Sequence, residues 1–339
     1  MHYLQHNLCI IALISLLTFL QSCKNSNDEP DMPIRENQAI VFFSDGVRFH
    51  GGFEDYKCKE PYYIIKPDCF EVIGDKWYAL EYNAYYSGGT NVNLLVNGQK
   101  QATILSNCYS VQQAVAYKQN GRFKAYIFYF DADKKYHGIH YDNGVIEEIG
   151  GLKDFERILL VRTVNNDVYA VWNMDVNNFY GVGNIVITKN GNPVKQNLKL
   201  PSNSSVKYFR DLCVEDTTIY TFFTLLHRDK NEAYYAKDNK LVIMNGLDDV
   251  CYGQVVDGKV YGLGLTTQNY CAKCCYWEDG KVTTIIPESA PVSPRGLVVE
   301  NGSIYYLVTN YAVNASILFR NGEEYIRQDG ELSGFKFIY

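Results

Sequence analysis

Three arginines occupy matching places in the chain: Arg157 in FERILL, Arg210 in YFRDL and Arg295 in SPRGL. Each precedes or begins an apolar run that we interpret as the innermost strand of a sheet. A guanidinium group offers a planar fork of donors that suits bidentate binding of carboxylates, sulfates and phosphates. If the three side chains converge, they form an anion site. Alternatively, each pairs with a neighbouring acid such as Asp211 or Asp249 and ties the fold together.

A second group of candidate residues lies in polar segments between strand-like runs. Asn, Asp, Gln and Tyr side chains can hydrogen-bond sugar hydroxyls, and tyrosine rings can stack on sugar rings. Solvated loops also contain these residue types without binding anything. The ligand-binding candidates in these segments are Tyr85, Asn173, Tyr270 and Tyr311, and Asp249 is a candidate together with the three arginines.

The sequence offers little evidence for catalysis. Glycoside hydrolysis needs two carboxylates that face each other across a site, and adjacent acids serve more often as turn or edge residues. An Asp131-x-Asp133 pair could contribute to a calcium site, but further oxygen ligands at regular spacing are missing. The acid pairs are Asp131 and Asp133, Glu147 and Glu148, and Asp248 and Asp249. An enzyme is therefore the alternative hypothesis, with catalytic residues unknown.

Cys271, Cys274 and Cys275 contain a CxxC spacing, which at face value suggests zinc. A structural zinc site usually takes four ligands, often from two such pairs, and the sequence has no second pair. Alternation along a strand would also point Cys274 and Cys275 to opposite faces. We expect buried thiols or one local disulfide here, and no metal or other cofactor.

The N-terminus reads as a targeting segment. The apolar run Leu8–Leu20 is 13 residues long, whereas a membrane-spanning helix needs about 20. It ends in Leu-Gln-Ser-Cys, which resembles a bacterial lipobox, and this resemblance implies a signal peptide over residues 1–22 and lipidation of Cys23. Cleavage of an ordinary signal peptide nearby is the alternative. Residues 23–37 are polar and acidic, typical of a flexible tether.

The acids of this tether add a resemblance of their own. An acidic cluster just after the cysteine is similar to the export signal of Bacteroidetes lipoproteins. It implies a lipid-anchored protein of the outer membrane, exposed at the cell surface. The acids concerned are Asp28, Glu29 and Asp31.

Composition narrows the class of protein. The net charge is −6, which argues against nucleic acid as a partner. The chain contains 29 tyrosines, and enrichment in Tyr, Val and Ile favours strands. No long segment keeps an apolar period of about 3.6 residues. We therefore expect an all-β protein with almost no helix.

One phrase recurs along the chain, an extended run with a tyrosine followed later by an Asn/Asp turn. Successive tyrosines lie 41 to 51 residues apart. Each unit reads as strand, turn, strand with tyrosine, longer loop, strand, turn, strand. Four antiparallel strands at this period are typical of a β-propeller blade. The aligned tyrosines are Tyr78, Tyr126, Tyr169, Tyr220, Tyr261 and Tyr305.

Six complete units run from about Asp68 to Gln328, and two pieces are left over. Ile40–Phe49 has the form of the last two strands of a blade, and Gly334–Tyr339 looks like an innermost strand. Completing one blade from both termini removes an open sheet edge, so we prefer seven blades over residues 38–339. Because this split blade lacks a second strand, six blades is the alternative. Residues 51–66 read as an insertion.

The best-preserved unit, Val255–Val282, has the pattern V-x-x-G-x-V-Y-x-x-G followed by Y-W-x-x-G-K-V. It resembles the tandem repeat of Bacteroidetes propeller lipoproteins without an assigned activity. In a propeller, the loops between second and third strands share one face with the connections between blades. We predict that this loop face and the channel mouth bind a glycan or protein ligand without catalysis. A carbohydrate-active hydrolase or lyase is the alternative. We expect a monomer that meets the membrane only through its lipid.

Overall fold

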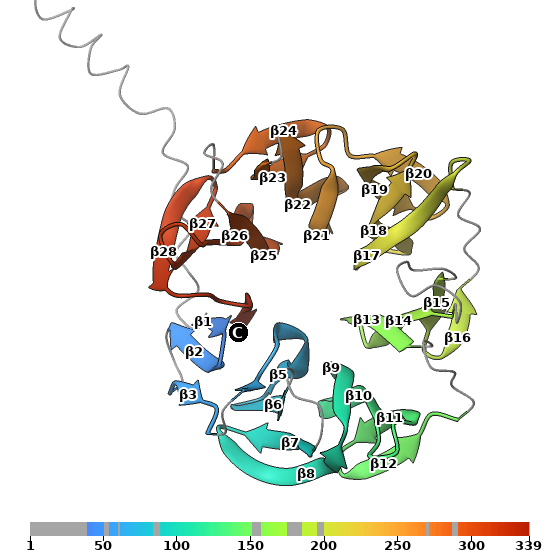
Figure 1. The fold of residues 1–339 in the computed structure, drawn as a ribbon, viewed down its shortest axis with the longest axis vertical. Coiled ribbons are helices and arrows are strands. Elements are labelled where there is room, and N and C mark those ends of the chain that lie inside the picture. Colours follow the sequence, from blue (N-terminus) through green and yellow to red (C-terminus); the bar gives the residue numbers. More distant parts are fainter. Residues whose placement is uncertain are drawn as a thin grey trace, which may run out of the picture. The chain divides into compact units, whose positions relative to one another are not determined.

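In the computed structural model, each repeated tyrosine lies in the second strand of an antiparallel sheet. Seven such sheets form a ring, as Figure 1 shows. The structure describes residues 39–50, 54–59, 62–83, 89–150, 157–174, 185–194, 200–268, 271–286 and 291–338. Several predictions fall on residues outside these ranges: the signal peptide, Cys23, the tether, Tyr85 and Tyr270. For Arg157 the structure describes the backbone and not the side chain. The all-β prediction and the preference for seven blades are confirmed.

Blades 2 to 4 each take four consecutive strands. Blade 2 contains β9 (Ser110–Gln119), β10 (Arg122–Phe130), β11 (Tyr136–Asp142) and β12 (Val145–Glu148). Blade 3 contains β13 (Arg157–Val164), β14 (Asp167–Asn173), β15 (Ile185–Lys189) and β16 (Asn192–Val194). Blade 4 contains β17 (Ser204–Glu215), β18 (Thr218–His227), β19 (Lys230–Lys237) and β20 (Lys240–Ile243).

Blades 5 and 6 follow the same plan, and blade 1 adds a strand. Blade 5 contains β21 (Asp249–Val256), β22 (Lys259–Gln268), β23 (Cys271–Glu278) and β24 (Lys281–Thr284). Blade 6 contains β25 (Val292–Glu300), β26 (Ser303–Asn310), β27 (Ala315–Arg320) and β28 (Glu323–Asp329). Blade 1 contains β4 (Tyr63–Ile64), the 3-10 turn η1 (Pro67–Cys69), β5 (Phe70–Ile73), β6 (Lys76–Asn83), β7 (Thr90–Val96) and β8 (Gln99–Cys108). Both β4 and β5 pair with β6.

Blade 7 is built from both ends of the chain and closes the ring. Its innermost strand is β29 (Gly334–Ile338), which pairs antiparallel with β1 (Ala39–Phe43). The sequence predicted that Ile40–Phe49 forms the last two strands of this blade. That prediction is wrong by one strand, because β1 and β2 (Gly46–His50) are the second and third strands. The outermost strand is β3 (Tyr56–Lys57), inside the segment that the sequence suggested as an insertion. No second strand is missing, and this removes the objection to seven blades.

A hydrogen bond explains why the tyrosine strand and the Asn/Asp turn recur together. The turn residue has a positive φ, between 42° and 51° in these blades, a conformation that Asn and Asp tolerate better than most residues. Its side-chain oxygen accepts the backbone N–H of the residue just before the tyrosine. The pairs are Trp77 with Asn97, Val168 with Asn190, Ile219 with Asp238, Val260 with Asp279 and Ile304 with Asn321. The outer turn is thereby tied back to the middle of its own blade.

The core lies between neighbouring blades, since each sheet buries both faces. Cys274 packs against Val308 of blade 6, and Cys275 joins the cluster shared with Phe222 of blade 4. The prediction that these two cysteines point to opposite faces is confirmed, and both thiols are free and buried. The side chain of Cys271 is outside the description. In the described part of the chain, no helix is long and apolar enough to cross a membrane.

Candidate functional site

A β-bulge recurs at one place in the innermost strands of blades 2 to 6. In each blade the innermost strand carries one extra residue here that has no partner on the tyrosine strand. This residue lies opposite the peptide bond that joins the second and third residues after the repeated tyrosine. Such a bulge bends the strand and re-aims a side chain. The extra residues are Gln112, Leu159, Arg210, Cys251 and Arg295. Two of the predicted arginines therefore occupy equivalent positions around the ring, together with a cysteine that sequence reasoning did not select.

Arg210 lies inside β17 rather than at its start, because β17 begins at Ser204. Its Nη2 donates to the Asp249 carboxylate of blade 5 at 2.8 Å. The guanidinium carbon also lies 4.2 Å from the ring centroid of Tyr208, a cation–π geometry. Asp249 accepts a second hydrogen bond, from the Thr224 hydroxyl. This pair links blades 4 and 5, as the pairing alternative for the arginines expects.

Arg295 is held by residues of its own blade and of the connection to blade 7. Its Nη2 donates to the Tyr311 hydroxyl and to the Glu331 carboxylate. The Tyr311 hydroxyl in turn donates to Glu331 at 3.1 Å. Two predicted site residues, Arg295 and Tyr311, are thus in contact. Asn173, by contrast, is the last residue of β14 and is 5 % exposed, so it is not the solvated loop residue that the sequence suggested.

Cys251 lies near the guanidinium groups of both Arg210 and Arg295. Burial and the charge of Asp249 raise the pKa of its thiol to about 12, while the two arginines oppose this shift. The thiol is therefore protonated and neutral near pH 7. Its place in the bulge could be found only from strand register, because no spacing in the sequence marks it.

A cavity of about 1120 Å³ lies at the centre of the ring and is lined by residues of all seven blades. We call it the channel. Arg295 is the one predicted site residue among its described lining. The lining holds six cationic and six anionic side chains: Arg48, Lys66, Lys118, Arg162, Arg295 and Lys336, with Asp45, Asp68, Glu71, Asp211, Asp329 and Glu331. Tyr62, Tyr63, Tyr117 and Tyr252 line it as well.

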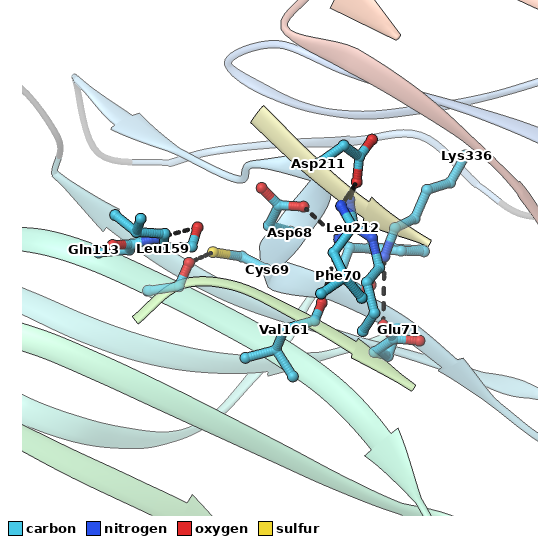
Figure 2. A network of polar contacts seen from close by, with 12 residues as sticks. Asp68, Cys69, Phe70, Glu71, Gln113, Leu159, Val161, Asp211, Leu212 and Lys336 are labelled. Atoms are coloured by element: carbon cyan, nitrogen blue, oxygen red, sulfur yellow. Dashed lines mark hydrogen bonds and ion pairs between the residues drawn. The ribbon is translucent and has the colours of Figure 1, made fainter. Parts of the chain in front are cut away.

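Several of these charges are paired across blade boundaries, and Figure 2 shows a network of such contacts. Arg162 of blade 3 contacts Asp211 of blade 4 at 2.8 Å and Asp68 of blade 1 at 3.8 Å. Lys336 of blade 7 donates to the Phe70 carbonyl at 2.6 Å and lies 3.4 Å from Glu71. These contacts hold the walls of the channel in place without leaving a large net charge in it.

Asp211 is the most buried carboxylate of this network. It accepts hydrogen bonds from the backbone N–H groups of Leu212 at 2.9 Å and Gly253 at 3.4 Å. Burial raises the pKa of its carboxyl, and the charge of Arg162 and the two N–H groups oppose that shift. Sequence reasoning named Asp211 only as a possible partner of an arginine and missed Arg162, because Arg162 lies in the second half of its strand.

No protein-family model and no curated protein matches this sequence. Solved structures with a related fold do match. The chain is similar to a puromycin-hydrolyzing peptidase of Mycobacterium tuberculosis, with 11% identity, a TM-score of 0.49 and coverage of 76% of this chain and 44% of that one. It thus spans less than half of that peptidase's length.

Two further matches cover most of both chains. The β-propeller domain of the Trilobed protease from Pyrococcus furiosus has 13% identity and a TM-score of 0.45, covering 86% of this chain and 84% of that one. A mutant Aleuria aurantia lectin in complex with Fucalpha1-6GlcNAc has 8% identity and a TM-score of 0.38, covering 76% and 92%. Similarity at this level carries no functional inference.

Proposed function

We propose that this protein is a binding module for a glycan and that the channel and its mouth form the binding site. The observation that carries this proposal is the channel lining, in which six cations balance six anions beside four tyrosines. A sugar hydroxyl both donates and accepts hydrogen bonds. Fixed ion pairs offer it both kinds of partner, and tyrosine rings offer apolar faces for the sugar C–H groups.

The size of the channel supports an oligosaccharide. Its volume of about 1120 Å³ is at the upper end of the roughly 300–1,000 Å³ usual for small-molecule pockets. The balanced charge also disfavours a strongly anionic ligand, since the guanidinium groups of Arg210 and Arg295 each already face a carboxylate. The Nε atoms of Arg210 and Arg295 are buried without a partner in the described part of the chain.

The test is a binding screen of a soluble form that begins at Lys24, against plant and host polysaccharides, with product analysis of every ligand bound. We expect Arg295→Gln to weaken binding about tenfold, since a hydrogen bond to a charged group is worth roughly 1.5–3 kcal/mol. Arg327→Gln is the matched control, because Arg327 pairs with Glu324 on the outermost strand of the same blade. Equal affinity of the two variants, or no glycan bound, would remove the channel from this role. Capture of a protein instead would favour a protein ligand.

One observation favours the alternative of a carbohydrate-active enzyme. Asp68 and Asp211 contact the same guanidinium, that of Arg162, and burial raises the pKa of Asp211. Glycoside hydrolases use a pair of carboxyl groups that flank the bond to be cleaved. If the screen yields products, Asp68→Asn should abolish them while binding is kept. Continued turnover by this variant would exclude the pair.

We also propose, from the sequence alone, that Cys23 carries lipid and anchors the protein in the outer membrane with the ring at the cell surface. This proposal rests on the lipobox-like sequence Leu-Gln-Ser-Cys and on the acidic residues that follow it. Metabolic labelling with an alkyne fatty acid should mark the wild-type protein and not Cys23→Ser. Labelling of both would disprove the assignment of Cys23. Protease treatment of intact cells tests surface exposure, and full protection of the protein would contradict it.

A further inference from the structure

A second cavity, of about 670 Å³, lies between the facing sheets of blades 2 and 3. We call it the cleft. Blade 2 contributes alternate residues of β10, and blade 3 contributes alternate residues of β14 and β15. Tyr117 is the one described lining residue that the cleft shares with the channel. Apart from Tyr117, the described linings of the cleft and the channel are therefore different.

Three aromatic side chains form the walls of the cleft. Tyr117 and Tyr126 of blade 2 are stacked, with ring centroids 5.6 Å apart and planes at 13°. Trp172 of blade 3 stands edge-on to Tyr126, at 6.4 Å and 71°. The indole Nε1 of Trp172 donates to the Thr188 hydroxyl at 3.2 Å, which fixes the plane of the ring. The ring of Tyr126 also lies 4.8 Å from that of His140, centroid to centroid. The cleft is thus lined by aromatic rings at two different angles, both held by neighbours.

Polar groups lie beside these rings. The Tyr117 hydroxyl and His140 Nε2 are 2.8 Å apart, and burial together with the charge of Lys124 lowers the pKa of His140. Lys124 Nζ pairs with Asp142 Oδ2 at 2.9 Å. The other oxygen of Asp142, Oδ1, is buried without a hydrogen-bond partner in the described part of the chain. The Lys124–Asp142 pair therefore leaves the cleft with little net charge.

We infer that the cleft binds one pyranose ring of an uncharged glycan. Apolar C–H faces of a sugar stack on Tyr126 and Trp172, while its hydroxyls reach the polar groups around His140. A purely apolar ligand would make no hydrogen bonds to His140, Asn190 or Gln119. An anionic ligand would gain little from Lys124, because Asp142 already neutralises its charge. Aromatic walls with a few placed polar groups are what a selective small-molecule pocket requires. This inference concerns a site distinct from the channel and does not depend on the channel function.

Tryptophan fluorescence isolates the cleft. The chain has three tryptophans, and Trp77 and Trp277 are only 2 % and 3 % exposed, whereas Trp172 is half-buried at the cleft wall. Acrylamide should therefore quench Trp172 selectively. The probes are methyl glycosides of glucose, galactose, mannose, xylose and fucose, added to the soluble form that keeps the whole ring. We expect at least one of them to protect Trp172 from quenching in a saturable manner.

Two variants test the assignment by different routes. Tyr126→Ala removes a stacking wall and should weaken protection about tenfold. Ala170→Leu fills the floor of the cleft and leaves every polar group in place, so it should also weaken protection. If Tyr126→Ala fails to fold, Ala170→Leu decides, with saturation-transfer NMR of the same glycoside as its readout.

Arg327→Gln is the control, because Arg327 pairs with Glu324 on the outermost strand of blade 6 and is absent from the described lining of both cavities. Wild-type protection of Trp172 in Arg327→Gln, with loss of protection in Ala170→Leu, supports the cleft whatever becomes of the channel proposal. Two results would overturn it: no glycoside protects Trp172 saturably, or filling the cleft leaves the affinity unchanged.

Discussion

The interface between blades 4 and 5 is filled with side chains, whereas the equivalent interface between blades 2 and 3 contains the cleft. Tyr235 of blade 4 and Trp277 of blade 5 meet with ring centroids 6.0 Å apart. By strand register, Gly138 stands where blade 4 has Tyr235, and Thr188 stands where blade 5 has Trp277. Both substitutions remove an aromatic ring from the same layer.

A glycine of blade 5 also shows that the interface between blades 4 and 5 is filled where the one between blades 2 and 3 is open. A Cβ on Gly262 would lie 2.4 Å from the end of Met244, which fills the space above it. The equivalent residue of blade 3 is Ala170, which lines the cleft. Equivalent positions in the strand register therefore give a packed interface or a pocket according to a few side-chain volumes. The repeat determines where blades lie, and departures from the repeat determine where ligands can enter.

Trp277→Thr should have the largest effect, because it gives blade 5 the residue that blade 3 has naturally. Trp277 is buried in the cluster with Met244 and Phe222, and truncating a buried aromatic costs about 3–5 kcal/mol of unfolding free energy. Urea unfolding followed by circular dichroism measures it. Trp172→Thr, at the half-open wall of the cleft, should lower the free energy of unfolding by clearly less. Equal losses would mean that the two interfaces are packed alike.

Two glycines on the filled side should differ in their tolerance of alanine. A Cβ on Gly253 would lie 2.1 Å from the ring of Phe222, which is fully buried. For Gly262 the one atom within 3.0 Å of an added Cβ is the flexible end of Met244. We expect Gly253→Ala to cost about 3 kcal/mol and Gly262→Ala about 1 kcal/mol, the two ends of the range for overpacking. Thermal and urea unfolding of both variants checks the order, and the reverse order would contradict the packing described.

The outer turns offer a smaller contrast between the same blades. Asp279 of blade 5 accepts the Val260 N–H at 3.0 Å, and the structure gives no such bond to Asn143 of blade 2 within the described residues. Both residues have a positive φ, so the backbone penalty for alanine is similar. Asp279→Ala should therefore lower the free energy of unfolding by about 1 kcal/mol more than Asn143→Ala does, which is the net value of one hydrogen bond. A difference near zero would show that the bond adds nothing.

The smallest expected effect is a pH dependence from the cleft. The folded-state pKa of His140 lies below its ordinary value of 6.5, so below about pH 6.5 the unfolded chain binds a proton more readily than the folded one. Stability is therefore lost as pH falls from 7 to 5. His140→Gln, beside Lys124, Asp142 and Glu147, should lose less stability over this interval. Urea midpoints at both pH values measure the difference, and identical pH slopes would exclude His140 as the cause.

The blade count could be predicted from the sequence because its signals are local. A tyrosine strand and an Asn/Asp turn are each defined by a few residues, and the turn requires a backbone conformation that those residues favour. The innermost position of Gly334–Ile338 followed from the same period. The two-residue strand Tyr56–Lys57 could not be foreseen, because two residues are too few to show alternation.

The sequence by itself therefore indicated the ring, seven blades in preference to six, and the opposite faces of Cys274 and Cys275. Only the tertiary structure decided which side chains meet. The bulge that aligns Arg210, Cys251 and Arg295 is a matter of register between strands. The Arg162–Asp211 pair and the cleft join different blades, more than 40 residues apart along the chain in the first case. Contacts of this kind depend on side-chain volume and charge across an interface that no local pattern encodes.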